Sequence, residues 1–258
     1  MPAQAWRSRT AIAALGMLCA APGAHARAVP PPAVPDTIAQ RTVACAACHG
    51  KEGRATSEGF FPRIAGKPAG YLYNQLLNFR DGRRQYPGMT YLVAHLSDDY
   101  LKEIAGHFAG LHLPYAPPAT IAMSPQVAAA AQKLVLQGDA QRKLPACVAC
   151  HGERLTGVQP AIPGTIGLPR DYLVAQLGAW KNGSRKAAAP DCMAQISRQL
   201  TADEIGALSS WLASRPLPAD MTPAAALSTP LPLDCGSVPG AAPAAAASAA
   251  AASAGAGK

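Results

Sequence analysis

Two short motifs in this sequence combine residue types that do recognisable chemistry. Each has the form Cys-X-X-Cys-His, and they span residues 45–49 and 147–151. Two cysteines at this spacing can form thioether bonds to the two vinyl groups of one porphyrin, and the histidine that follows is then placed to bind its iron. The motif occurs twice, 102 residues apart. We therefore expect two covalent c-type haems, attached through Cys45, Cys48, Cys147 and Cys150.

Each haem iron then has one axial ligand from its motif, His49 or His151, and needs a second one. The sequence after Cys150 contains no histidine besides His151, so the second half must use another residue type. Met89 follows the first motif histidine by 40 residues, and Met193 follows the second by 42. Because both precede a predicted amphipathic helix at a matching distance, we expect these two methionines as the sixth ligands. Histidine/methionine ligation raises the reduction potential, and a filled coordination sphere suits electron transfer better than the binding of oxygen or peroxide.

Other residues compete for some of these roles. His95 is the alternative ligand in the first half, whereas His107 and His112 are expected to be surface or packing residues. A motif histidine also needs an acceptor for its second ring nitrogen. The carbonyl groups of Pro62 and Pro160, 13 and 9 residues after their motif histidines, are the candidates.

An internal repeat organises the chain. Residues 66–84 align with residues 167–185 at an offset of 101, and eight of the 19 positions are identical. The identical pairs are Gly66/Gly167, Pro68/Pro169, Tyr71/Tyr172, Leu72/Leu173, Gln75/Gln176, Leu76/Leu177, Gly82/Gly183 and Arg84/Arg185. We therefore expect two domains, at residues 36–112 and 124–238, joined by a proline-rich linker at residues 113–123. Each has a workable single-domain size.

The periodicity within each unit is helical. Residues 69–80 and 170–181 carry apolar groups at helical spacing, and Ser124-Pro125 begins a helix over 126–137. Ser97 precedes another helix, and Thr201 opens a capping box with Glu204. No stretch alternates like a strand for long, so the predicted fold class is all-α.

The N-terminal segment carries an export signal. Residues 1–26 combine two arginines, a short apolar run and an Ala-His-Ala site, so we expect cleavage after Ala26. An uncleaved anchor or a lipid on Cys19 fits less well, because the apolar run is short and the Ala-His-Ala site lies beyond Cys19. Residues 27–35 are proline-rich. Residues 239–258 are an alanine-rich tail that we expect to be disordered, a surface tether being the alternative.

The net charge of the chain excludes few classes of function by itself. The formal net charge is +8, and two haems bring up to four propionate groups that offset it. No basic arm interleaved with aromatic residues indicates nucleic-acid binding. No segment after the export signal is predicted to span a membrane.

These features together resemble the class I cytochromes c, and two such units in one exported chain are similar to the periplasmic dihaem proteins of the cytochrome c-four group. The resemblance covers about residues 36–215 and implies two tandem class I cytochrome c domains. It implies a periplasmic electron carrier, not an enzyme, that passes single electrons between a dehydrogenase or respiratory donor and a terminal oxidase or other acceptor. The alternatives are a dihaem enzyme, either a thiosulfate dehydrogenase or a peroxidase, and a fixed cytochrome subunit of a periplasmic alcohol or aldehyde dehydrogenase. The sequence around Cys235 resembles such subunits.

Two cysteines of the exported part, Cys192 and Cys235, lie outside the motifs. An oxidising compartment favours a disulfide between them, which would hold the segment after the last helix against the loop of Met193. The alternative is that the Cys192 thiolate binds the iron, which would lower the potential and suggest catalysis.

Basic residues near the first motif are candidates for steering an acidic redox partner, and an ordinary solvated surface is the alternative. They are Lys51, Arg54, Arg63, Lys67, Arg80, Arg83 and Arg84.

Overall fold

The computed structural model describes residues 34–239. The predicted export signal, most of the proline-rich segment after it and nearly all of the alanine-rich tail lie outside these residues. The chain divides into two units between Pro35 and Asp36. The unit that begins at Asp36 contains both haem motifs, in two halves that each carry one.

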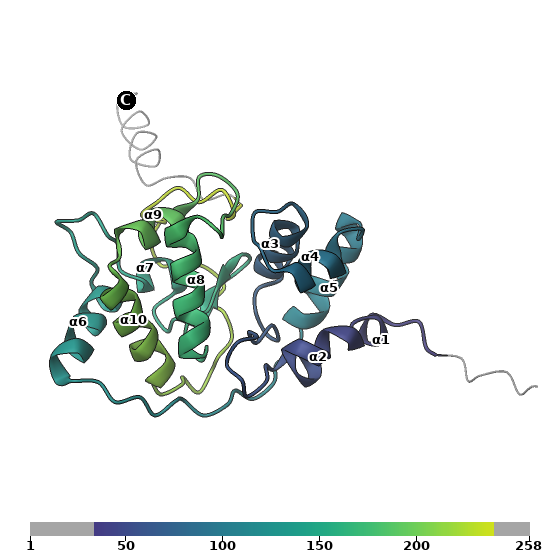
Figure 1. Ribbon diagram of the computed structural model, residues 1–258, viewed down its shortest axis with the longest axis horizontal. Helices are drawn as coiled ribbons and strands as arrows, with labels where there is room; N and C mark the ends of the chain where they lie inside the picture. The colour runs from purple at the N-terminus through teal and green to yellow at the C-terminus, as the bar shows by residue number, and fades with distance from the viewer. Residues whose placement is uncertain (1–33, 240–258) are drawn as a thin grey trace, which may run out of the picture. The chain divides into compact units, whose positions relative to one another are not determined.

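The first half is built from helices (Figure 1), and a small apolar core lies between them. They are α1 (Ile38–Arg41), the 3₁₀ turns Val43–Cys45 and Lys51–Gly53, α2 (Ala46–His49), α3 (Ala69–Arg80), α4 (Pro87–Val93) and α5 (Asp98–Ala109). Helix α3 packs against both α5 and α4. Leu72 from α3 meets Ile104, Ala105 and Phe108 from α5 in this core, and the side chain of Ser97 caps α5 by accepting from the Tyr100 N–H.

The second half repeats this plan with a larger core. It contains α6 (Pro125–Leu136), α7 (Val148–His151), the strands β1 (Gly157–Val158) and β2 (Ile162–Pro163), α8 (Arg170–Asn182), α9 (Cys192–Gln199) and α10 (Ala202–Ser214). Helix α10 packs against both α6 and α8 (Figure 1), and its Trp211 is only 6% exposed. The predicted caps are confirmed: Ser124 accepts from the Val127 N–H, and Thr201 and Glu204 form the reciprocal capping box.

Two local features differ from the prediction. Met193 does not lie in a loop but in the first turn of α9, because Asp191 caps this helix by accepting from the Ala194 N–H. The second half also contains a two-residue antiparallel pair, β1 with β2. Strands this short leave no alternating pattern in a sequence. The all-α architecture with two tandem cytochrome-like halves is otherwise as expected.

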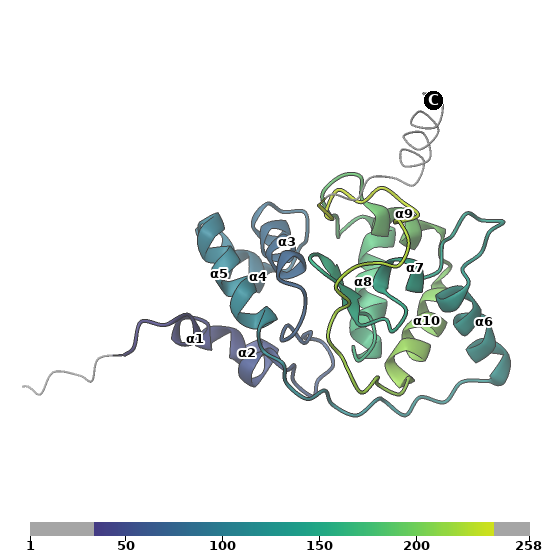
Figure 2. The same ribbon diagram turned by 180° about the vertical axis from the view of Figure 1, so that it is seen from behind.

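The linker after the first half and the segment after α10 contain no helix. The linker hydrogen-bonds to both halves: Arg63 donates to the carbonyl oxygen of Pro114, and the Ala119 N–H donates to the carbonyl oxygen of Ala213. After α10 the chain runs back along the second half as an irregular segment, residues 215–238, which we call the C-terminal strap (Figure 2).

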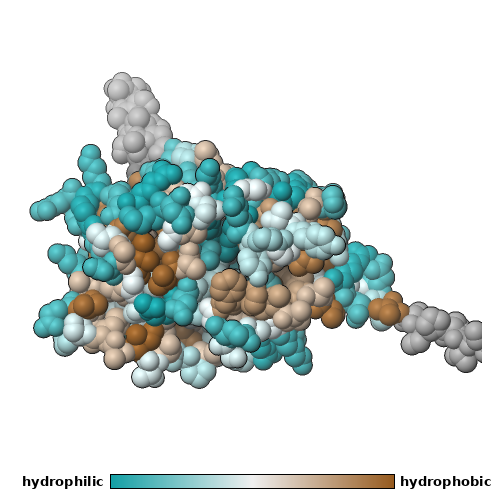
Figure 3. Space-filling model, viewed as in Figure 1, coloured by the Kyte–Doolittle hydropathy of each residue, from teal (hydrophilic) through white to brown (hydrophobic). Residues whose placement is uncertain are grey.

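The surface is mixed in character. On the face shown in Figure 3, apolar residues form separate groups among hydrophilic ones. Within residues 34–239, none of the helices has the length and apolar character needed to cross a bilayer.

Candidate haem sites and the interface between them

Each haem motif folds into one short helical turn that ends on its histidine. The turns are α2 and α7, and their histidines, His49 and His151, are both 8% exposed. The four motif cysteines are free thiols, although two other cysteines of the same chain form a disulfide. They are therefore free to form thioether bonds. Each turn places its two cysteines and its histidine within one run of helical backbone conformation, and their joint role in one haem site stays a prediction.

A proline carbonyl orients each imidazole. His49 Nδ1 lies 2.9 Å from the carbonyl oxygen of Pro62, as predicted, and His151 Nδ1 lies 2.7 Å from that of Pro163. Since a carbonyl only accepts, Nδ1 carries the proton in both rings, and Nε2 is left with its lone pair. Burial lowers the pKa of both imidazoles, which also favours this neutral form. Both rings are thus prepared to bind iron through Nε2.

The expectation for Pro160 is wrong. Its carbonyl oxygen accepts from the Gly70 N–H of the first half, 3.0 Å away, and so it is not the acceptor for His151. The β1–β2 pair is the physical reason, because it turns the chain between these two prolines and brings Pro163 back to the motif.

A sharp backbone turn follows each motif histidine. Gly50 has a φ of 72° and Gly152 a φ of 81°, both in the region that favours glycine. A Cβ at Gly50 would also collide with the carbonyl oxygen of Ala55. The glycine after each histidine is therefore required for the chain to leave the site.

The two methionines lie in matching positions. Met89 is half-buried on α4, which packs on α3, and Met193 is half-buried on α9, which packs on α8. The alternative ligand His95 is exposed beyond the end of α4. Met221 packs against the core of the second half. The equivalent placement supports the assignment of Met89 and Met193, which stays a prediction.

The predicted disulfide is present: Cys192 and Cys235 are bonded, with a Cα–Cα distance of 5.1 Å. This excludes the alternative in which a free Cys192 thiolate binds iron. The disulfide joins the first residue of the helix that carries Met193 to the C-terminal strap.

Four buried cations surround the contact between the halves, and none of the buried residues in the described part is acidic. They are Arg63, Lys67, Arg84 and Arg185, each less than 10% exposed. Buried charges need a partner of opposite charge. Each haem carries two propionates, so two haems bring four carboxylates to four cations. The residues present therefore fit two haems in charge as well as in thiol and imidazole content.

The repeated residues account for much of this contact. Arg84 donates to Gln176 Oε1 (2.8 Å), and Arg185 donates to Gln75 Oε1 (2.7 Å), so that each arginine bonds to the other half. Each arginine also bonds to the glutamine of its own half, at 3.0 and 2.7 Å. The two arginines pair as an antiparallel β-bridge. Arg84 also donates to the hydroxyl oxygen of Tyr172, at 3.1 Å. Members of three identical pairs therefore meet at one pseudo-symmetric contact: Gln75/Gln176, Arg84/Arg185 and Tyr71/Tyr172.

Lys67 is a second feature that links the halves. Its side chain is 4% exposed and donates to the carbonyl oxygen of Gly164, next to the proline that orients His151. Burial lowers the pKa of Lys67 to about 8, with a smaller effect from nearby Arg63. No sequence pattern indicates this burial, because Lys67 reads as one of several surface cations near the first motif.

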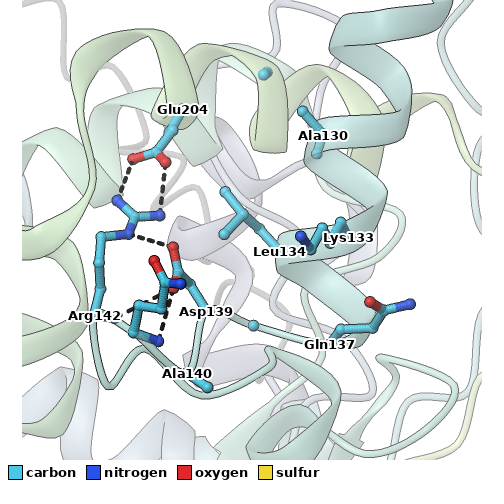
Figure 4. A pocket seen from close by; sticks show the side chains of 12 residues that line it. Ala130, Lys133, Leu134, Gln137, Asp139, Ala140, Arg142 and Glu204 are labelled. Carbon is cyan, nitrogen blue, oxygen red and sulfur yellow. Dashed lines mark hydrogen bonds and ion pairs between the residues drawn. The ribbon is translucent and has the colours of Figure 1, made fainter.

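A surface cleft of about 590 Å³ lies elsewhere, between α6, the 137–142 turn and α10 (Figure 4). Arg142 crosses it, bonded to Glu204 at 2.8 Å and to Asp139 at 2.7 Å. It contains none of the motif cysteines, histidines or candidate methionines. Arg142, Asp139 and Glu204 are paired with one another, so this group has the character of a structural brace.

Comparison with known proteins places this geometry in a family. No family model matches the chain. The chain is 37% identical to the "Thiosulfate dehydrogenase electron acceptor" of Stutzerimonas stutzeri, over 67% of this chain and 79% of the relative. It is 35% identical to the protein of the same description from Thiomonas intermedia, over 80% and 90%. Cytochrome c4 of Pseudomonas aeruginosa is 30% identical over 67% and 84%.

Solved structures agree. The reduced cytochrome c4 from Pseudomonas stutzeri matches with a TM-score of 0.58 and 27% identity, over 69% of this chain and 96% of that one. A thiosulfate dehydrogenase, TsdBA, from Marichromatium purpuratum matches with a TM-score of 0.59 and 34% identity over 67% of this chain. This chain spans only 36% of that longer one. Together with the two motifs, the oriented histidines and the four buried cations, these matches show that the chain belongs to the dihaem class I cytochromes c, the electron carriers that include cytochrome c4.

Proposed function

We propose that this protein is a periplasmic carrier that accepts electrons from a thiosulfate dehydrogenase and passes them to a further acceptor. The observation that carries the proposal is the likeness to two proteins described as electron acceptors of that enzyme, at 37% and 35% identity. The stoichiometry is consistent with it. Oxidative coupling of two thiosulfate ions to tetrathionate releases two electrons, and two haems accept one each.

The residues of the chain have defined tasks in this proposal. His49 and His151 supply the axial nitrogen, and the carbonyls of Pro62 and Pro163 fix both rings so that they do not rotate when the iron changes charge. Met89 and Met193 supply the sulfur that stabilises Fe(II) and raises the potential. Haem c, when bound, supplies the one-electron chemistry by cycling between Fe(III) and Fe(II). We assign the protein no substrate reaction of its own.

The buried arginines have an electrostatic task. Arg84 and Arg185 share their glutamine partners across the contact between the halves, and these buried cations would hold haem propionates by their charge. A rigid, dry contact of this kind lowers the reorganisation needed when an electron moves between the haems.

The test uses oxidised holoprotein, thiosulfate and a purified thiosulfate dehydrogenase. We expect reduction of both haems, with two haems reduced per tetrathionate formed, only when all three are present. The carrier with thiosulfate alone is the control. Reduction of the haems with formation of tetrathionate in that control would identify an enzyme instead, and no reduction in the complete mixture would refute the proposed donor.

A further inference from the structure

The C-terminal strap covers one side of the second half. Its backbone extends the short sheet: the Ala224 N–H donates to the carbonyl oxygen of Gly157 at 2.9 Å, and the Gln159 N–H donates to that of Ala224 at 2.8 Å. Nearer the start of the strap, Asp220 forms an ion pair with Arg154, at 2.8 Å. At its end Asn74 of the first half donates to the carbonyl oxygen of Ser237, at 2.9 Å.

The strap also contributes to an apolar cluster against which a half-buried motif cysteine packs. Leu231 and Cys235 of the strap are 5% and 7% exposed and form one apolar cluster with Val158 and Ile162. Cys150 of the second motif packs against this cluster. Disulfide bonding of Cys235 to Cys192 fixes it in place. The side chain of Cys150, which would attach the second haem, is therefore partly covered by the protein's own chain.

The first half leaves the corresponding region open. Cys48, the counterpart of Cys150, is exposed. Large apolar side chains of the first half are exposed as well: Val43 (57%), Phe60 (56%), Tyr91 (84%) and Leu92 (50%). Met89 and Met193 are 104 residues apart. At this offset the counterparts of Tyr91 and Leu92 are the polar Gln195 and the half-buried Ile196. We call Val43, Cys48, Phe60, Tyr91 and Leu92 the open apolar set.

Aromatic contacts connect part of this set to the first motif. The rings of Phe60 and Phe61 lie 5.1 Å apart, and that of Phe61 lies 6.3 Å from the His49 imidazole. Tyr86, which precedes α4, contacts both phenylalanines at 6.0 and 6.2 Å. The second half has Pro160, Ala161 and Ile162 in the loop after its motif and forms no such aromatic cluster within residues 34–239. Surface apolar groups in the first half therefore extend inward to the iron-binding imidazole.

We propose that the strap closes the second haem to other proteins, so that the electron donor docks on the open apolar set and delivers its electrons through the first haem. This rests on the proposed function, and the occupant is the thiosulfate dehydrogenase. The choice of this enzyme as the docking partner is supported by a solved thiosulfate dehydrogenase chain, 36% of which is similar to this protein. Electron-transfer contacts are small and short-lived, and exposed apolar side chains on the half whose motif cysteine Cys48 is exposed suit one.

The experiment compares two matched lysine substitutions in the full-length holoprotein. Tyr91→Lys places a charge in the open apolar set, and Gln195→Lys places the same charge at the equivalent, exposed position of the second half. We expect Tyr91→Lys to slow reduction by the pre-reduced dehydrogenase at least tenfold and Gln195→Lys to slow it less than twofold. Binding is mapped separately by adding the enzyme, without thiosulfate, to ¹⁵N-labelled oxidised protein, where we expect the shifts to centre on residues 43–48, 60 and 91–92.

The outcomes separate the two proposals. If the enzyme neither binds nor reduces the wild-type protein, the proposed donor is wrong, and this docking site falls with it. If the wild-type protein is reduced but Gln195→Lys slows the reaction as much as Tyr91→Lys, or the shifts centre on α9, only the docking site is overturned.

Discussion

Removal of the disulfide between Cys192 and Cys235 tests whether the strap is held by a covalent constraint or by its packing alone. The substitution is Cys192→Ala with Cys235→Ala, because alanine leaves no unpaired hydroxyl in a position that is 7% exposed in the native protein. The two cysteines are 43 residues apart in the sequence. Closing a loop of this length in the unfolded chain corresponds to about 4 kcal/mol in the chain-entropy model.

The expected loss is therefore a large fraction of the stability of an ordinary domain. We expect the free energy of unfolding of the second half to fall by about 4 kcal/mol, while the first half changes little. Guanidinium unfolding of the holoprotein measures this. The far-red charge-transfer band of sulfur-ligated Fe(III) haem reports the Met193 bond separately, and we expect part of this band to disappear at a lower denaturant concentration in the variant.

A packing control separates the covalent effect from loss of apolar contact. Leu231→Ala keeps the disulfide but removes a side chain that is 5% exposed, which costs about 2–5 kcal/mol in a buried position. It should lower the free energy of unfolding, but the far-red band should disappear only as the second half unfolds and not at a lower denaturant concentration. If the double alanine variant unfolds within about 1 kcal/mol of the wild-type protein and keeps the whole band, the disulfide does not constrain the ligand helix.

Three further predictions concern the iron ligands and the buried cations. Met89→Ala and Met193→Ala should each remove about half of the far-red band and lower the potential of one haem, whereas Met221→Ala should leave both unchanged, as visible absorption and a redox titration would show. Arg185→Gln should destabilise the holoprotein by about 1.5–3 kcal/mol through loss of charged hydrogen bonds, and the exposed Arg170→Gln by less than about 0.5 kcal/mol, in matched denaturant unfolding. Burial, with a smaller effect from Arg63, lowers the pKa of Lys67 from 10.5 to about 8, so without an anionic partner only the unfolded chain would keep the proton between these values and stability would rise with pH by about 3 kcal/mol. A haem propionate beside Lys67 raises this pKa again, so we expect the holoprotein to show less than half of that rise relative to Lys67→Met in unfolding experiments from about pH 7 to 11. The full rise would show that no propionate pairs with Lys67.

The sequence was sufficient where a short pattern determines the outcome. The capping residues Ser97, Ser124 and Thr201 predicted helix starts that the structure confirms. Elimination also worked for the spare cysteines, because a chain with two of them after its predicted export signal has one intramolecular pairing available. These signals are local or purely compositional, so folding does not alter them.

Predictions failed where the site depends on how loops cross. Pro160 and Pro163 are equally plausible in the sequence, and only the β1–β2 turn decides which carbonyl meets His151. Burial of Arg63 and Lys67 depends on the linker and the second half, whose carbonyl groups accept from them 51 and 97 residues away in sequence. The covering of Cys150 by the strap is equally non-local. A charge or loop pattern by itself carries no information about such contacts.

The internal repeat shows at which positions the two halves are alike and at which they differ. Positions that are identical in the two halves, such as Gln75/Gln176 and Arg84/Arg185, bond across the contact between them, where each half must satisfy the other. Tyr91 and Gln195 differ, and both are exposed to solvent. The halves are thus alike where they must exchange an electron with each other and unlike where they meet other molecules. A carrier with one open and one covered haem gives an incoming electron a defined route, because the second haem receives it through the first.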